Sequence, residues 1–472
     1  MQFVADLHLH SKYSRAVSKN MVLPIMAEWG KKKGIDILSV SDWTHPLWLR
    51  EIRTQLEEAG EGVYKLKNQK SKIKDNEKEP LFLLSVEVSS IYSQGGKLRR
   101  IHSLIFAPNF EIAEKINKEM VHRGVNLMSD GRPIMGLSAK NLLELTLAID
   151  KRVIFIPAHA WTPHFGIFGS ASGFNSIEEC FGELSRYIYG VETGLSSDPW
   201  MNWQIKDLDN RSILSFSDAH SPPKMGREAT VFEIDKTRDT LSYMDIGKAI
   251  ARSTEKCKVA YTIEFYPEEG KYHYSGHRNC GVVEDPTKVK ETNHICRVCG
   301  RRLTEGVMYR LSQLAQNSKL KTQNSKLDKN GVSWVSPGEK NRPPFVRLVP
   351  LNEIIAESLS STVASEKVKQ SFNDLCAKFG SEIEILLHTQ ISDIKSFCGE
   401  KIAEGVLKVR KGDIVIDPGF DGEYGKVKIW PASPDPLRSE ASEQASRGGS
   451  EKEEVKKVSK VKTPTSQMGL EF

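Results

Sequence analysis

The first 265 residues alternate short apolar runs with longer amphipathic segments, and this alternation limits the possible folds more than any other feature. The short runs have the β-branched and aliphatic content of strands, which we predict at residues 3–7, 35–40, 81–86, 100–106, 153–157, 189–191 and 213–216. The longer segments have helical periodicity, and we predict helices at residues 23–33, 111–122, 138–150 and 176–187. Strands that alternate with helices favour a parallel sheet or barrel, so the predicted fold class is α/β.

Each predicted strand carries or leads into a side chain of a type that binds metal ions. The first ends at His8-Leu9-His10, and both imidazoles face one side because strand residues i and i+2 point the same way. An isolated pair of this kind is more often a surface or core feature without a ligand. The later strands add eight further candidates: Asp42, His45, Glu87, His102, His159, Glu192, Asp218 and His220. Because the carboxyl ends of barrel strands meet at one face, the set predicts a metal site at that mouth.

Nine of these residues resemble the ligand set of the polymerase and histidinol phosphatase (PHP) domain, namely His8, His10, Asp42, His45, Glu87, His102, His159, Asp218 and His220. The resemblance implies a distorted (β/α)7 barrel with two or three divalent metal ions (Zn, Mn or Mg) that hydrolyses phosphate esters. Paired ions suit this chemistry because they stabilise the attacking and leaving oxygens of an in-line displacement. Asp218 and Glu87, with His8 and His10, are the catalytic candidates. The adjacent Asp-His pair common in the family is spread here into Asp42-Trp43-Thr44-His45.

Loops at the predicted mouth carry basic and aromatic side chains that suit a nucleic-acid substrate. The candidates for substrate binding are Lys12, Tyr13, Ser14, Arg15, Trp43 and Trp161. Lysine and arginine can bind phosphate, and aromatic rings can stack on bases. The alternative for any single ring is that it fills the core of its loop.

Residues 266–312 contain a second set of ligand types, spaced as in a zinc ribbon. His277-x-x-Cys280 is followed by Cys296-x-x-Cys299, which predicts one structural zinc ion with four protein ligands. The fourth ligand is open, since His273 or His294 could replace His277. Three arginines beside the second pair could neutralise DNA phosphates, namely Arg297, Arg301 and Arg302.

Several stretches also resemble the endonuclease Q family, up to about residue 430. They are residues 42–46, 157–163, 192–199, 261–265 and 268–273. That family nicks DNA on the 5′ side of deaminated bases such as uracil, hypoxanthine and xanthine, and at abasic sites. The resemblance therefore implies a double-stranded DNA substrate that contains such lesions.

The last third of the chain is predicted to hold a flexible insert, a mainly helical domain and a disordered tail. The insert, residues 313–345, is polar and repeats Gln-Asn-Ser-Lys-Leu; helical spacing then marks residues 346–430. Residues 431–472 have too few large apolar side chains for a core. The tail ends in Gln-Met-Gly-Leu-Glu-Phe, which resembles a motif that binds the DNA sliding clamp, with contacts from Gln467, Met468, Leu470 and Phe472.

Composition narrows the class of protein without identifying it. The chain has 472 residues, 39% hydrophobic and 27% charged, and no apolar run long enough to cross a membrane, so we expect a cytoplasmic protein without a membrane partner. A net charge of +6 is weak evidence for a polyanionic partner at this length. Two alternatives to a DNA repair endonuclease stay open: a phosphoesterase or exonuclease acting on other phosphate esters, and a clamp-tethered DNA-binding protein with a silent barrel.

Overall fold

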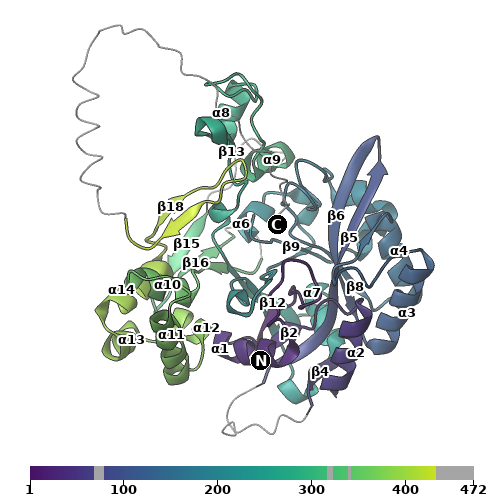
Figure 1. The fold of residues 1–472 in the computed structure, drawn as a ribbon, viewed down its shortest axis with the longest axis horizontal. Helices are drawn as coiled ribbons and strands as arrows, with labels where there is room; N and C mark the ends of the chain where they lie inside the picture. The colour runs from purple at the N-terminus through teal and green to yellow at the C-terminus, as the bar shows by residue number, and fades with distance from the viewer. Residues whose placement is uncertain (68–78, 316–322, 338–341, 432–472) are drawn as a thin grey trace, which may run out of the picture. The chain divides into compact units, whose positions relative to one another are not determined.

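The fold is mixed α/β, as predicted, with one large sheet and helices packed around it (Figure 1). The computed structural model describes residues 1–67, 79–315, 323–337 and 342–431. Met1–Ile429 forms one compact unit. Within the described ranges, no helix is long and apolar enough to cross a membrane.

Seven strands in the first half of the chain position the candidate site, and each overlaps a predicted strand. They are β1 (Gln2–Asp6), β2 (Ile37–Ser39), β5 (Leu81–Gln94), β6 (Lys97–Ala107), β8 (Ile154–Pro157), β9 (Gly190–Glu192) and β10 (Ser212–Leu214). The other described strands are β3 (Leu56–Gly60), β4 (Val63–Leu66), β7 (Ile134–Met135), β11 (Ala229–Ile234), β12 (Cys257–Glu264), β13 (Ser275–His277), β14 (Val282–Glu284), β15 (Asn324–Leu327), β16 (Ser333–Ser336), β17 (Phe345–Arg347), β18 (Val415–Asp417) and β19 (Lys426–Lys428).

The large sheet is mixed rather than parallel. Its order among the described strands is β15-β16-β17-β12-β11-β1-β2-β5-β4-β3, with β6 paired to β5 and β8, and β7 paired to β5. The β1–β2 and β2–β5 pairs are parallel, as expected for successive βα units. In contrast, β6 runs antiparallel to β5 and β8, and β11 runs antiparallel to β1. The β5–β6 pair is antiparallel because Gly95-Gly96 joins the two strands directly, and a short turn can connect only antiparallel strands.

The helices of the first 315 residues begin where local capping signals favour them. They are α1 (Leu23–Lys33), α2 (Pro46–Gln55), α3 (Phe110–His122), α4 (Ala139–Ile149), α5 (Ile177–Phe181), α6 (Pro199–Asn202), α7 (Tyr243–Ile250), α8 (Pro286–Glu291) and α9 (Val307–Leu314). Asn109, Ser138 and Ser176 cap α3, α4 and α5 by accepting a backbone N–H three residues on. The four predicted helices correspond to α1, α3, α4 and α5 with the 3₁₀ turn that follows it.

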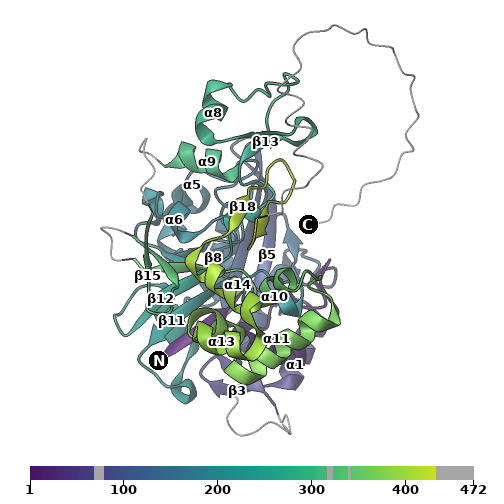
Figure 2. The same cartoon turned by 90° about the vertical axis from the view of Figure 1, so that its left-hand side faces the viewer.

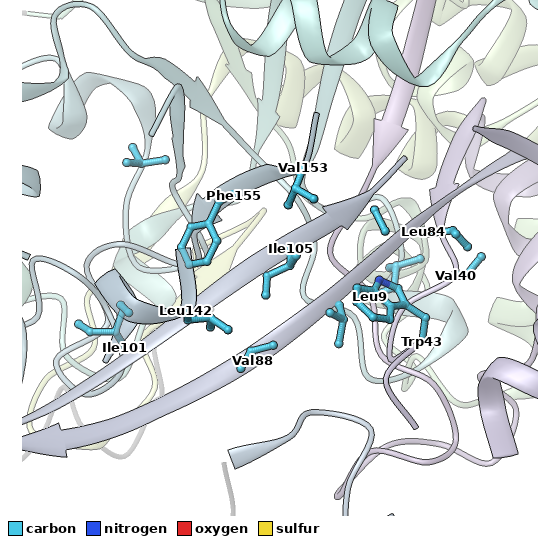
Figure 3. Close-up of a cluster of buried hydrophobic side chains, with 14 of the residues drawn as sticks. Leu9, Val40, Trp43, Leu84, Val88, Ile101, Ile105, Leu142, Val153 and Phe155 are labelled. Carbon is cyan, nitrogen blue, oxygen red and sulfur yellow. The ribbon is translucent and has the colours of Figure 1, made fainter. Parts of the chain in front are cut away.

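The main apolar core lies where β5, β6 and β8 meet their covering helices. Figure 3 shows Val88 on β5, Ile105 on β6 and Phe155 on β8 beside Leu142 of α4. Leu9 and Trp43 belong to the same cluster, so the loops that carry the predicted ligands are anchored in the core. Burial of this apolar area is the main force that fixes the strand ends in space.

Residues 275–309 have a small core of their own around the predicted zinc ribbon. Val282, Val289, Cys296, Leu303 and Tyr309 form a separate buried cluster. Five residues are few for an independent core. The fold of this segment therefore needs a further constraint, which a bound metal ion can supply.

The segment predicted as a flexible insert, residues 313–345, differs from that prediction in its described part. Asn324–Leu327 and Ser333–Ser336 form β15 and β16, and β16 pairs with β17, which extends the large sheet beyond β12. Trp334 packs edge-on against Tyr261 of β12. Each strand of this hairpin is only four residues long, so its pattern is too short to predict a strand within a polar segment.

The helical region after residue 346 consists of α10 (Leu351–Ser358), α11 (Glu366–Phe379), α12 (Glu382–Leu387), α13 (Ile391–Cys398) and α14 (Glu400–Lys411) (Figure 2). Lys33 of α1 forms a buried ion pair with Glu382 of α12, with 2.7 Å between Nζ and Oε2. Arg410 is also buried and donates to four backbone carbonyls, those of Asn330, Ile385, Leu386 and Thr389. The predicted tail, residues 431–472, lies outside the described residues apart from residue 431.

Candidate metal centres

The strand ends bring the predicted ligands to one place through direct backbone pairing. A parallel bridge joins Leu9 to Ala219, and the His10 N–H donates to the Ala219 carbonyl over 3.2 Å. This pairing sets His8 and His10 beside Asp218 and His220. Within the β5–β6 hairpin, His102 stands opposite Ser89 of β5, whose hydroxyl lies 3.1 Å from His102 Nε2.

Seven predicted ligands form three overlapping groups, in each of which the ligand atoms lie within 4.8 Å of one another. The groups are His8-His10-Glu87, His10-Asp218-His220 and Glu87-His102-His159. Glu87 and His10 each belong to two groups. The shortest contacts join Glu87 Oε1 to His102 Nδ1 at 2.5 Å and to His159 Nε2 at 2.9 Å. His10 Nε2 lies 3.4 Å from Glu87 Oε2 and 3.1 Å from Asp218 Oδ1.

Asp42 and His45 stand beside these groups and are not members of them. Asp42 accepts from the Ser11 N–H at 2.6 Å and the Ser14 hydroxyl at 2.8 Å, and its Oδ1 lies 3.3 Å from His10 Nδ1. The His45 ring stacks on Tyr13, with ring centroids 4.3 Å apart. Asp42 therefore orients His10, whereas the His45 ring packs on Tyr13 outside the three groups.

Glu192, the remaining strand-end candidate, supports two of the histidines. Its carboxylate oxygens lie 2.9 and 3.0 Å from His8 Nδ1, and Oε2 accepts the His159 backbone N–H at 2.8 Å. A carboxylate on the outer nitrogen of a histidine fixes the ring and leaves Nε2 for a metal ion. His8 Nε2 is buried and has no hydrogen-bond partner among the described residues.

The electrostatics are those of a charged site held in a buried environment. Burial alone would lower the pKa values of His8 and His10, but Glu192 and Asp218 raise that of His8, and Asp218 and Asp42 raise that of His10, well above the ordinary value. Burial opposes ionisation of Glu87 and Asp218, yet His102 and Arg132 hold the pKa of Glu87, and His8 and His10 that of Asp218, well below the usual range. The carboxylates of the site therefore stay ionised, and their negative charge favours a cation beside them.

Backbone conformation also singles out the ligand loops. Asp42, His159 and Asp218 have φ values of 46°, 28° and 47°, in the left-handed region that non-glycine residues rarely adopt. Gly194 is packed against His159, and an added Cβ would lie 2.4 Å from the His159 Cβ. Residues in such conformations persist only where the surrounding structure enforces them, and they cluster at functional sites.

The donor set fits divalent metal ions. Imidazole nitrogens and ionised carboxylates are buried together, and His8 Nε2 has no hydrogen-bond partner among the described residues. The carboxylates around it favour a bound cation. Imidazole suits zinc and other transition ions, and carboxylate suits magnesium and manganese.

The second candidate centre consists of His277, Cys280, Cys296 and Cys299, whose ligand atoms also lie within 4.8 Å of one another. Cys299 Sγ lies 3.5 Å from His277 Nδ1. Of the two alternative histidines, His273 is buried against Tyr274, and His294 Nε2 lies 3.0 Å from the Tyr309 hydroxyl, so neither belongs to the group. The four side chains therefore lie close enough together to bind one metal ion, as their spacing in the sequence predicts.

Comparison with solved structures places the chain in a family. The chain superposes with a TM-score of 0.75 on the lesion-specific endonuclease PfuEndoQ from Pyrococcus furiosus, at 29% identity over 93% of this chain and 99% of that one. A complex of endonuclease Q with a 27-mer duplex, bearing an abasic lesion at the active site, gives the same TM-score at 30% identity, over 93% of this chain and 100% of that one. This chain belongs to the endonuclease Q family.

Curated relatives extend the comparison of this endonuclease Q family member. The uncharacterized protein YqxK of Bacillus subtilis is 27% identical over 439 residues, 90% of this chain and 98% of that protein. The uncharacterized protein MJ0043 of Methanocaldococcus jannaschii is 30% identical over 287 residues, 60% of this chain, and the chain spans only 33% of that relative. Residues 350–413 match the family model described as the MJ0043 C-terminal domain.

Of the predicted substrate-binding residues of this endonuclease Q family member, some are exposed and others are held by contacts with acidic side chains. Arg15 is 75% exposed and lies 3.4 Å from Asp130. Lys12 and Tyr13 are both tied to Glu51, by an ion pair of 2.9 Å and a hydroxyl hydrogen bond of 2.6 Å, while Ser14 is buried on Asp42. On the ribbon, Arg297 lies 3.5 Å from Glu284, Arg302 lies 3.3 Å from Glu305, and Arg301 is exposed.

Trp43 and Trp161 require a correction. Both were expected at the substrate surface, but they are 0% and 1% exposed and lie in the main core, where Trp161 donates to Asn202 Oδ1. Neither ring has a free face for a base in this structure. Their loops turn inward because large aromatic side chains bury more apolar area in the core than they could at the mouth.

Arg132 is a side chain at the centre that the sequence did not indicate. It follows no predicted strand, and its neighbours Asp130 and Gly131 read as an ordinary turn. In the structure, its Nη1 lies 3.1 Å from Glu87 Oε2. Only the tertiary fold brings this residue to the centre, and no local pattern in the sequence marked it.

Proposed function

We propose that this protein is a metal-dependent DNA repair endonuclease that nicks the phosphodiester on the 5′ side of deaminated bases, such as uracil, hypoxanthine and xanthine, and at abasic sites. The observation that carries the proposal is the likeness, over 93% of the chain at 30% identity, to an endonuclease Q complexed with a duplex bearing an abasic lesion. The buried ligand groups at the same strand ends that the PHP resemblance selects support a hydrolytic role.

Under this proposal, the site residues have different roles according to their position. His8, His10, Glu87, His102, His159, Asp218 and His220 would hold the ions, and Asp42 and His45 would support them from the adjacent loop. When bound, divalent ions supply electrophilic stabilisation of a phosphodiester and activation of water. The Glu87 side chain is fully buried, whereas that of Asp218 is 27% exposed. Glu87 would therefore hold metal from inside the site, and Asp218 would lie on the face that meets the substrate.

DNA recognition under this proposal rests on phosphate contacts and on base extrusion. Arg15 at the mouth and the ribbon arginines are exposed cations that can neutralise phosphates. We propose that the damaged nucleotide leaves the stack for a pocket near the centre, which costs a few kcal/mol and least where pairing is already weakened. Deaminated and abasic sites meet that condition, so extrusion itself favours them.

The ribbon ligands are proposed to hold a single structural zinc ion, because three thiolates and an imidazole form a closed set. The C-terminal motif, with Gln467, Met468, Leu470 and Phe472, lies outside the described residues, and we propose that it binds the DNA sliding clamp. Removing residues 467–472 would then lower nicking on clamp-loaded DNA and leave nicking on free linear DNA unchanged. Equal loss on both substrates would contradict the clamp proposal.

A lesion panel tests the nuclease proposal. Duplexes of one sequence, labelled at the 5′ end of one strand, would carry dU, dI, an abasic site or the normal base at one position. We expect a single nick 5′ to each lesion and none in the normal duplex. Equal cutting of all four duplexes, or release of nucleotides from an end, would contradict the proposal and favour a general phosphoesterase or an exonuclease.

A further inference from the structure

Arg132 belongs to a segment whose backbone is anchored by hydrogen bonds before and after it. The backbone N–H of Gly131 donates to the Tyr13 carbonyl at 3.0 Å, and the carbonyl of Pro133 accepts from Ser89 of β5 at 2.9 Å. The backbone N–H of Arg132 itself donates to Asp130 Oδ1 at 3.1 Å. An arginine with its backbone anchored in this way reaches the centre from a set direction.

Gly131 allows this segment to lie directly over the ligand-supporting loop. An added Cβ at Gly131 would stand 2.4 Å from the Ser14 hydroxyl and 2.5 Å from Asp42 Oδ2. The close approach brings the Arg132 guanidinium to Glu87, yet the side chain stays 21% exposed. Arg132 therefore touches a predicted metal ligand from the solvent side of the centre.

The charge around Arg132 changes once the centre is loaded with ions. In the structure, Arg132 is balanced by Glu87, with Asp218 and Asp130 nearby. A divalent ion shared by Glu87 and its histidines would take up that carboxylate charge. The guanidinium would then stand beside like charge in a partly buried site, which is unfavourable unless an anion binds there. A phosphodiester supplies that anion, and a guanidinium matches its oxygens with two parallel hydrogen bonds.

We propose that Arg132 is a further catalytic residue, which leaves Glu87 and binds a non-bridging oxygen of the scissile phosphodiester when the metal-loaded centre takes its DNA substrate. This inference rests on the proposed nuclease function. Arg132 stabilises the charge that gathers on the phosphoryl oxygens, so its contribution increases in the transition state.

A binding experiment tests the phosphate contact apart from catalysis. The full-length protein, loaded with one metal and checked for metal content, is titrated calorimetrically with inorganic phosphate. We expect Arg132→Ala to bind phosphate roughly tenfold to a hundredfold more weakly than the wild type, the loss typical of one hydrogen bond between charged groups. Arg152→Ala removes a partly exposed arginine that is paired with Asp150 outside the site, and should match the wild type. Equal phosphate affinity in the Arg132→Ala protein would overturn the proposal.

Kinetics and rescue separate a substrate contact from a structural role. On bis(p-nitrophenyl) phosphate and on the dU duplex, kcat/KM of Arg132→Ala should fall by about 10²–10³. Arg132→Lys should recover only part of it, because an ammonium cannot make the bidentate contact. Added guanidinium ion should raise the rate of the Arg132→Ala protein and not that of the wild type. A fall in bound metal that accounts for the whole loss would overturn the proposal, since Arg132 would then act only through Glu87.

The two proposals fail in different ways. If the wild type does not distinguish the dU duplex from normal DNA, the nuclease function fails, while the phosphate titration still decides the role of Arg132. If lesion nicking is intact and Arg132→Ala binds phosphate and cuts as the wild type does, only the Arg132 inference fails.

Discussion

Glu87 lies in the middle of a long strand, and this position lets one residue serve two ligand groups. Ser85, Glu87 and Ser89 alternate along one face of β5, where Ser85 donates to the Leu7 carbonyl and Ser89 contacts His102. The sequence predicted the residue as a ligand but ended the strand before it. The polar alternation after Val86 was the available signal, and it was obscured because the strand is buried on both faces up to Ser90.

Glu192 is expected to tune the centre without binding an ion. Glu192→Gln keeps the size of the side chain but removes the charge that faces His8 Nδ1. Loss of such a partner typically weakens metal affinity about tenfold to a hundredfold. Competition with a fluorescent chelator measures this loss, and unchanged affinity of the Glu192→Gln protein would contradict the supporting role.

Glu264 is expected to make stability depend on pH. Burial raises its pKa well above the ordinary value of 4.5, and hydrogen bonds from Thr262 and Ser215 only partly oppose this rise. A carboxyl with a raised folded pKa contributes stability that is complete below the unfolded pKa and is lost as pH rises through the folded pKa. Denaturant titrations from acidic to alkaline pH should show the free energy of unfolding falling less steeply for Glu264→Gln than for the wild type. Parallel curves would contradict this account.

At the scale of elements, the positions of strands and helices were predictable from local apolar patterns. The order and direction of the strands in the sheet were not predicted. All seven strands of the site and four helices match predicted segments, because β-branched runs and amphipathic spacing are local signals. The antiparallel direction of β6 depends on the Gly95-Gly96 turn, and the β15–β16 hairpin depends on contacts with β17 and β12. The Gly-Gly turn was a local hairpin signal in the sequence, whereas the contacts of β15 and β16 with β17 and β12 are tertiary and leave no pattern in a single sequence.

The ribbon is expected to depend on its metal. Its own apolar cluster is small, so Cys296→Ser should release zinc and lower hydrogen-exchange protection across residues 275–309. Cys398→Ser, in α13 and outside any candidate centre, is the matched control and should keep both. Full protection of the ribbon in the Cys296→Ser protein would show that the metal is not needed for this fold.

At the scale of the whole molecule, the helical region is joined to α1 by buried charge as well as by apolar contact. Lys33 and Glu382 are 1% and 3% exposed, and the Trp29 ring stacks on Phe372 with centroids 5.8 Å apart. The sequence predicted the helices of this region, but no local pattern could indicate that Lys33 pairs with a residue about 350 positions later. A lysine in the last turn of an amphipathic helix ordinarily reads as solvent-exposed.

Breaking this ion pair on one side should be costly. Lys33→Met leaves Glu382 buried without its partner and should lower the free energy of unfolding by about 3–5 kcal/mol. Lys33→Met combined with Glu382→Leu should restore most of that loss, because no uncompensated charge remains. Lys32→Met, which removes a neighbouring lysine paired with Glu28, should cost under about 1 kcal/mol. A Lys33→Met protein as stable as Lys32→Met would contradict the buried pairing.

The central claim is that the converging strand ends hold metal ions that carry out lesion-directed cutting of DNA. Its most direct test is nicking of a dU duplex by protein stripped with a chelator, then supplied with Zn²⁺, Mn²⁺ or Mg²⁺ one at a time, for the wild type and Asp218→Asn. We predict no cutting by the stripped protein, recovery with at least one ion in the wild type, and a loss of orders of magnitude in Asp218→Asn at an unchanged Tm. Cutting by the stripped protein, or wild-type rates in Asp218→Asn, would contradict the claim.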